Sequence, residues 1–116
     1  MCRMSAIYAI AAVALLAGCV EETSRPGIAD GVFNLDPEAC GDTSSVTRLT
    51  VSGDEFRFYE SRCQMQPRTA GAEGLQATLI CMGEGETFER NVTLKSSENL
   101  LTMRESGNRF DYHRCS

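Results

Sequence analysis

The sequence predicts an all-β fold, a small antiparallel meander that closes into a barrel or packs as a sandwich and is stapled by disulfides. Three observations predict it. Short stretches of β-branched and aromatic residues are separated by glycine-containing turns, with no helical period. Hairpin signals follow one another at close spacing. Cysteines are numerous for so short a chain, which is typical of small exported domains.

The first half of the predicted domain contains three strands. Residues 31–35 are the first expected strand, and residues 36–41, which include Asp36 and Pro37, are a turn or a single helical turn. Residues 46–52 and 55–62 are expected to pair as a hairpin around Ser52, Gly53 and Asp54, because Gly-Asp between two alternating segments is a turn signal.

The second half predicts two further hairpins. Strands over 75–82 and 87–95 are joined by the turn at 83–86, and strands over 100–104 and 109–114 are joined by the turn at 105–108. The segment 66–74 contains Pro67, Gly71 and Gly74 and is expected to be the longest loop.

Alternation of apolar and polar residues indicates which side chains form the core. Successive strand residues point to opposite faces, so apolar residues two apart share the buried face. The expected core residues are Leu49, Val51, Phe56, Phe58, Phe88, Val92, Leu94, Leu101, Met103, Phe110 and Tyr112.

Residues 1–18 have the composition of a secretory signal peptide. Arg3 is followed by an apolar run over 6–17 and then by small residues, and the run is shorter than the about 20 residues that a membrane span needs. The segment from Leu16 to Cys19, Leu-Ala-Gly-Cys, closely resembles the lipobox of bacterial lipoproteins. This resemblance implies that Cys19 carries diacylglycerol, that the chain is cut before it, and that the new amine receives a fatty acid such as palmitate.

The residues after Cys19 bear on the destination of the protein. In enterobacterial lipoproteins an aspartate at the next position retains the protein in the inner membrane, whereas this chain has Val20. The resemblance therefore implies a bacterial envelope protein held in the outer membrane and facing the periplasm. Residues 19–29 are polar, contain Pro26 and Gly27, and are expected to be the lipidated cysteine and a flexible tether, which leaves 30–116 as one small β domain.

Once Cys19 is assigned to lipid and Cys2 is removed, four cysteines remain, namely Cys40, Cys63, Cys81 and Cys115. An even number in an exported domain predicts two disulfides. We prefer Cys40–Cys63 with Cys81–Cys115, because a hairpin over 46–62 brings the first two together. The alternative is Cys63–Cys81 across a hairpin centred on Ala72, with Cys40–Cys115 joining the first and last strands.

The net charge and the cysteine spacing argue against several classes of partner and cofactor. The formal net charge is −5, and cleavage before Cys19 removes one basic residue, Arg3, and no acid, so the mature chain is at −6. This charge argues against nucleic acid or an anionic membrane surface as the partner and suits a cationic protein. The cysteines lack metal-type C-x-x-C spacing and there is one histidine, so no zinc or other metal and no cofactor is expected.

No catalytic residue is predicted. His113 lies near Asp111 on one strand, but no nucleophile context accompanies them, and we interpret His113 as a surface residue. The acidic group at one turn is interpreted as solvated charge rather than a carboxylate pair; it consists of Glu84, Glu86 and Glu89. The protein is therefore expected to be no enzyme.

Residues 77–110, about a third of the mature chain, resemble the periplasmic inhibitors of C-type lysozyme. They follow the family order of a Cys-bearing strand, two further strands and a Ser-Gly-x-Arg-aromatic loop, here Ser106 to Phe110. Arg104 and Glu105 stand where the family has a further Ser-Gly, and Phe110 stands for a tyrosine. The resemblance implies that Ser106, Gly107 and Arg109 contact a partner, with Arg109 facing the catalytic acids of the lysozyme.

Two functions are expected on these grounds. The first is a lipid-anchored envelope lipoprotein with a non-catalytic binding or structural role and an unassigned partner. The alternative is an inhibitor of C-type lysozyme or of a related cationic cell-wall hydrolase, to which the acidic body of the chain would be attracted.

Overall fold

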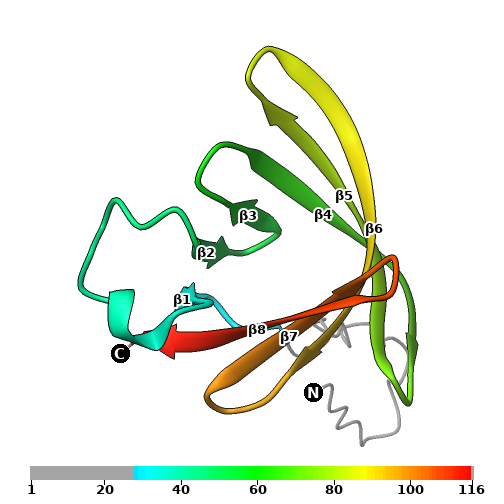
Figure 1. Ribbon diagram of the computed structural model, residues 1–116. Coiled ribbons are helices and arrows are strands. Elements are labelled where there is room, and N and C mark those ends of the chain that lie inside the picture. Colours follow the sequence, from blue (N-terminus) through cyan, green and yellow to red (C-terminus); the bar gives the residue numbers. More distant parts are fainter. Residues whose placement is uncertain (1–27, 116) are drawn as a thin grey trace, which may run out of the picture.

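The computed structural model describes residues 28–115, which form a closed antiparallel barrel of eight strands (Figure 1). Each strand pairs with the next along the chain, and β8 pairs with β1 to close the barrel. This confirms the all-β prediction and decides between its two forms in favour of the barrel. No helix within these residues is long and apolar enough to cross a membrane.

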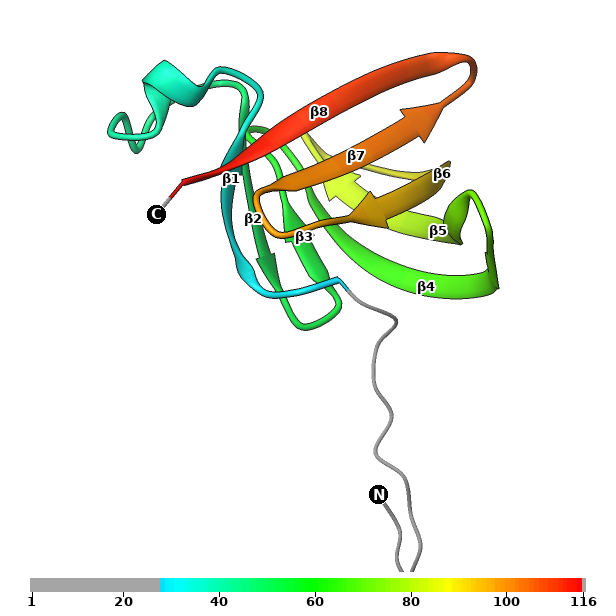
Figure 2. The same cartoon turned by 90° about the horizontal axis from the view of Figure 1, so that it is seen from below.

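The meander connects its strands mostly by short turns (Figure 2). In chain order the elements are β1 (Gly31–Asn34), η1 (Pro37–Ala39), β2 (Arg48–Ser52), β3 (Glu55–Arg57), β4 (Arg62–Gly71), β5 (Gly74–Gly83), β6 (Glu86–Ser96), β7 (Leu100–Glu105) and β8 (Asn108–Cys115). The predicted strands correspond to these elements except around β3 and β4.

The expected loop over 66–74 is instead the end of one strand and the start of the next. The predicted strand over 55–62 stops at Arg57, the chain reverses, and β4 then runs from Arg62 to Gly71. Pro67 pairs with Ala77 of β5, but the pairing of β4 with β3 ends before it, at Gln64. On the β3 side of β4 there is therefore no strand that would need an N–H from Pro67. The register shifts between Pro67 and Thr69, where β4 bends.

Sixteen buried hydrophobic side chains fill the interior of the barrel. Eight of the expected core residues are among them, namely Leu49, Val51, Phe56, Val92, Leu94, Leu101, Met103 and Tyr112. Phe58 and Phe110 are partly buried and pack against this core. Ile28, which precedes the predicted start of the domain, is also buried, so the folded part includes it.

Phe88 was expected in the core, and this prediction is wrong, because its side chain is 38% exposed. The cause is the length of β6. Residues Thr93 to Ser96 pair with β7, whereas the first half of β6 pairs with β5 alone. Phe88 therefore lies on the interior side of β6 but beyond the end of β7, so that β7 does not cover its side chain.

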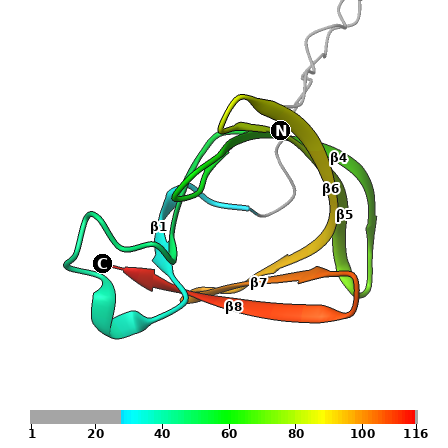
Figure 3. The same ribbon diagram turned by 45° about the horizontal axis from the view of Figure 1, so that its top comes forward.

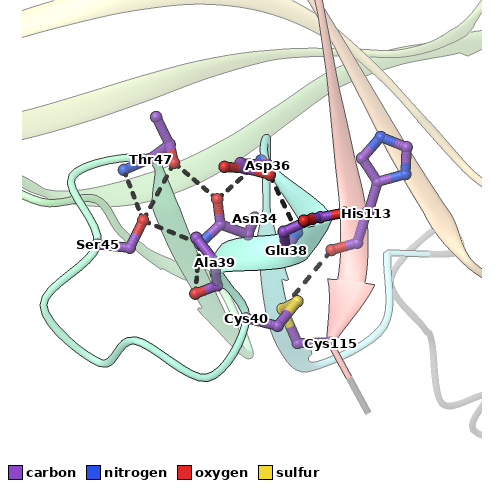
Figure 4. Close-up of a disulfide and its surroundings, with 9 residues drawn as sticks. All are labelled: Asn34, Asp36, Glu38, Ala39, Cys40, Ser45, Thr47, His113 and Cys115. Carbon is purple, nitrogen blue, oxygen red and sulfur yellow. Dashed lines mark hydrogen bonds between the residues drawn. A yellow bond between two sulfur atoms is a disulfide. The ribbon is translucent and has the colours of Figure 1, made fainter.

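The preferred disulfide pairing is also wrong, and the alternative is observed: Cys63–Cys81 and Cys40–Cys115. The reason is the short β3. Because the chain reverses before Cys63, that residue opens β4 rather than closing β3, and it stands directly opposite Cys81 of β5 with a Cα–Cα distance of 4.0 Å. Cys40 follows η1, which lies beside the end of β8 and so beside Cys115 (Figure 4).

A buried asparagine organises the connection between β1 and β2. The Asn34 side chain is completely buried. Its Nδ2 donates to Ser45 Oγ (3.0 Å) and to the Ala39 carbonyl (3.5 Å), and its Oδ1 accepts from the Asp36 amide (2.9 Å) and from Thr47 Oγ1 (2.6 Å). These bonds, drawn in Figure 4, hold both ends of the connection against the barrel.

The seam that closes the barrel is short. β1 and β8 pair over Val32 to Asn34 and His113 to Cys115. Two features reinforce it: the Cys40–Cys115 disulfide, and the Arg114 guanidinium, which lies 4.8 Å from the centre of the Phe33 ring.

Candidate functional site

The hairpin of β7 and β8 presents the residues that the sequence singles out. Its turn consists of Ser106 and Gly107, with φ of 51° and 83°, and it is closed by the pairing of Glu105 with Asn108. Two central residues with positive φ are typical of the turns that match the twist of a two-stranded hairpin. Ser106, Gly107 and Arg109 are all exposed, so the structure brings the three predicted contact residues together at one exposed tip.

Two arginines stand directly opposite each other below this turn. Arg104 of β7 pairs in register with Arg109 of β8, and both side chains are exposed on the outer face. Like charges in directly opposite positions destabilise a pair of strands. Within residues 28–115 no carboxylate lies within ion-pair distance of Arg104, so nearby acids do not neutralise its charge.

Asp111 holds Arg109 in place. Arg109 Nε donates to Asp111 Oδ1 at 2.9 Å, and Thr102 Oγ1 donates to the same oxygen at 3.2 Å. The hydrogen bond from Arg109 lowers the pKa of Asp111, with smaller contributions from other neighbours. Asp111 therefore bonds to Arg109 and Thr102, and His113 lies two residues farther along the same strand.

A concave polar surface lies on the outer face of β6, β7 and β8, beside the end of the β4–β5 hairpin. Figure 3 draws this end and the turn of the β7–β8 hairpin at the right edge of the barrel. The concave surface comprises two adjoining hollows of about 300 and about 510 Å³ that share Thr93, Arg104 and Arg109. We call it the polar cleft and define it by Arg68, Gln76, Asn91, Thr93, Lys95, Arg104 and Arg109.

The wall of the polar cleft that faces the hairpin is also ordered by hydrogen bonds. Arg68 Nε donates to Thr78 Oγ1 at 3.1 Å, and Thr78 Oγ1 donates to Asn91 Oδ1 at 2.9 Å. This chain of bonds links β4, β5 and β6 across the outer face. The terminal nitrogens of Arg68 and the amide nitrogen of Asn91 take no part in these bonds.

Glu105, which also lines the polar cleft, is neutralised from the interior side. Arg90 binds it through two nitrogens, with Nη2–Oε1 at 2.8 Å and Nε–Oε2 at 3.1 Å, and the Arg90 guanidinium lies 4.9 Å from the centre of the Phe58 ring. Such two-pronged pairs are strong and geometrically specific. Glu73 is the other acid on the lining, against four cations.

The remaining candidates are distributed elsewhere. Cys19 lies outside the described residues. Glu84 sits at the turn between β5 and β6, and its close approach to Glu60 raises the pKa of the Glu60 carboxyl through a hydrogen bond and charge repulsion. Glu86 and Glu89 are exposed on β6. Four cysteines form the two disulfides described above.

Sequence reasoning missed most of the polar cleft. The sequence pattern places Arg68 in the expected loop over 66–74, and Gln76, Asn91 and Thr93 are ordinary polar strand residues with no motif. One signal was available: a two-residue turn at Ser106 and Gly107 places Arg104 opposite Arg109, which identifies an unfavourable pair of like charges.

Comparison of the chain with protein-family models, with curated proteins and with solved structures finds no match.

Proposed function

We propose that the chain is a lipid-anchored protein of the bacterial envelope with a non-catalytic binding role. Its support is the charged and apolar N-terminal run ending at Cys19, together with two disulfides, which fit an oxidising compartment such as the periplasm. The polar cleft carries the binding part of the proposal. The barrel interior is filled by side chains, whereas the outer face displays arginines held in place by hydrogen bonds.

The anchor is tested by mass spectrometry of the full chain expressed in a bacterium. We expect a mature protein that begins at Cys19 and carries a diacylglycerol group. The Cys19→Ser variant should keep its N-terminal segment and lose the lipid mass. A wild-type chain that is recovered uncut and without lipid would overturn the anchoring part of the proposal.

The binding role has a second, more specific candidate, inhibition of C-type lysozyme or of a related cationic hydrolase. The observation that favours it is the exposed Ser106–Gly107 turn beside Arg109, on a protein with a negative body. A cationic enzyme would be attracted to the body, and Arg109 would meet the acids of its cleft.

Inhibition of cell-wall lysis by several lysozymes tests this candidate. The expected result is inhibition that weakens with added salt and falls strongly in the Arg109→Ala variant. Arg57→Ala removes an exposed arginine of β3, outside the polar cleft, and serves as the matched control, which should inhibit as the wild type does. Absence of inhibition for every enzyme would remove the candidate and leave the binding role open.

A further inference from the structure

We propose that the polar cleft binds a short anionic oligosaccharide, through its carboxylate or phosphate groups. The proposal deepens the binding role given above, and it depends neither on the lipid anchor nor on lysozyme.

The charges select an anionic ligand. Four cationic side chains line the polar cleft, namely Arg68, Lys95, Arg104 and Arg109, and its two acids are Glu73 and Glu105. Glu105 is already bound by Arg90, and Asp111, just outside the lining, pairs with Arg109, so that Arg68, Lys95 and Arg104 face one remaining acid, Glu73. A local excess of positive charge therefore remains on a protein whose net charge is negative. Guanidinium groups match the two-oxygen geometry of carboxylate and phosphate, so these are the groups that the cleft is suited to bind.

The arginines are partly ordered before any ligand arrives. Arg109 Nε donates to Asp111 on one side of the cleft, and Arg68 Nε donates to the Thr78 hydroxyl on the other. Each bond engages Nε and leaves the outer nitrogens for a ligand. Arg104 lies between them on β7, opposite Arg109, and its unfavourable position is relieved when an anion is shared by the two guanidiniums. Side chains ordered in advance lose less entropy on binding.

The floor selects a ligand rich in hydroxyl groups. Between the two arginine-bearing walls the surface is formed by the amides of Gln76 and Asn91 and by the hydroxyl of Thr93. These groups both donate and accept hydrogen bonds, as sugar hydroxyls do. The two hollows, about 300 and about 510 Å³, fall in the range of small-molecule sites and suit a few sugar rings rather than a folded partner.

Nucleic acid is the less favoured polyanion for this surface. The residues that define the polar cleft include no aromatic side chain on which bases could stack. Because charges beyond about 8 Å are screened at physiological salt, a short anion in the cleft responds to the local arginines. A long polyanion would extend over the negative remainder of the surface, which repels it.

Titration of the full chain in detergent micelles tests the inference, with binding followed by calorimetry and by the side-chain amide NMR signals of Gln76 and Asn91. Four probes are compared at equal length: an oligogalacturonate, a neutral maltooligosaccharide, the same maltooligosaccharide bearing phosphate esters, and a single-stranded oligonucleotide. We expect an anionic sugar to bind and to shift both amide signals, and the neutral sugar to bind at least about tenfold more weakly, because charge-assisted hydrogen bonds are lost. Binding of the carboxylated or of the phosphorylated probe alone identifies the group recognised, and either supports the proposal.

Variants localise the site. Arg68→Gln and Arg104→Gln should each weaken binding by about tenfold, whereas Arg57→Gln removes the same charge outside the polar cleft and should leave binding unchanged. Absence of binding by both anionic sugars, equal losses in all three variants, or tighter binding of the oligonucleotide would each overturn the inference. If lysozyme inhibition is intact while sugar binding fails, the inference is wrong and the proposed function stands.

Discussion

Among single residues, Asn34 is a buried polar side chain that joins the connection between β1 and β2 to the barrel. Its side chain is completely buried and makes four hydrogen bonds to the connection between β1 and β2. We expect Asn34→Ala to lower the free energy of unfolding by about 2–4 kcal/mol, because the Asp36 amide and the Thr47 hydroxyl lose their buried acceptor. Chemical denaturation measures the change. Ser44→Ala, an exposed change in the same connection, is the control and should lie within about 0.5 kcal/mol of wild type; a similar effect of both would contradict this role of Asn34.

Tyr112 makes the stability of the barrel sensitive to alkaline pH. Burial of its ring raises the pKa of the phenol above the ordinary value of 10.0. Its folded-state pKa exceeds the unfolded one, so its stabilising contribution is complete below pH 10 and is lost as pH rises through the folded pKa. We expect the free energy of unfolding to fall in that range.

The two tyrosines of the barrel provide a control for this prediction. Absorbance of tyrosinate during an alkaline titration should show a high-pH step that disappears in Tyr112→Phe. The step should persist in Tyr59→Phe, because Tyr59 is 54% exposed and Tyr112 is 6% exposed. A high-pH step that survives in Tyr112→Phe would show that another group causes it.

For single residues, the sequence predicts burial well where the alternation along one strand determines it, and poorly where the position of a neighbouring strand determines it. Leu49 and Met103 are buried as their spacing predicts. Phe88 has the same spacing and is exposed, because burial depends on whether β7 reaches its level, and strand offsets are not encoded in one strand's pattern. Arg68 joins the polar cleft through pairings of distant segments, which no local motif records.

Among the elements, the turn between β4 and β5 depends on one glycine. Gly74 has φ of +126°, and a Cβ there would overlap the backbone carbonyl of Leu94 in β6. We expect Gly74→Ala to cost about 2–4 kcal/mol, since it combines backbone strain with a contact that cannot relax through a side chain. Gly71 flanks the same turn with open space around its Cβ position, and Gly71→Ala should change stability by less than about 0.5 kcal/mol.

Thermal and chemical unfolding of the two alanine variants measures this difference. Because the turn borders the polar cleft through Ala72 and Glu73, Gly74→Ala should also shift the NMR signals of nearby β6 residues such as Thr93. Equal stability of the two variants would mean that the turn can move away from β6 without cost.

The same hairpin explains where prediction of the elements failed. Pro67, Gly71 and Gly74 are signals of a loop, yet all three lie in strands. Pro67 lies where β4 has no second neighbouring strand, and the position of Gly71 has open space around it. Gly74 has a positive φ that only glycine adopts easily. Hairpins with a compact turn, such as the one at Ser106 and Gly107, were predicted correctly because two strands of similar length flank a clear turn signal.

For the molecule as a whole, the two disulfides should respond differently to reductant. Cys63 and Cys81 are buried, at 1% and 0% exposure, whereas Cys40 and Cys115 are partly exposed. We expect mild reductant to open Cys40–Cys115 first while Cys63–Cys81 stays closed until the barrel unfolds. Alkylation at intervals followed by mass spectrometry of peptides measures the order, and simultaneous loss of both would contradict it.

The partly exposed disulfide, Cys40–Cys115, should nevertheless contribute more to the free energy of unfolding than Cys63–Cys81, because it lowers the conformational entropy of the unfolded chain more. It closes a sequence separation of 75 residues, against 18 for Cys63–Cys81. In the chain-entropy treatment these separations correspond to about 4.5 and about 3 kcal/mol. The sequence correctly predicts the number of bridges, whereas their pairing depends on the short β3, which shifts Cys63 onto the next strand.

The even number of strands determines the end of the barrel at which the N-terminal segment leaves the folded domain. In an up-and-down barrel of eight strands, β1 begins and β8 ends at one end, as the pairing of Val32 with Cys115 shows. The turn at Ser106 and Gly107 lies at the opposite end, the full eight residues of β8 away, or about 25 Å (Figure 2). If the proposed lipid anchor precedes β1, it is attached at the end of the barrel opposite this turn, which leaves the turn as the part of β8 farthest from the point of attachment.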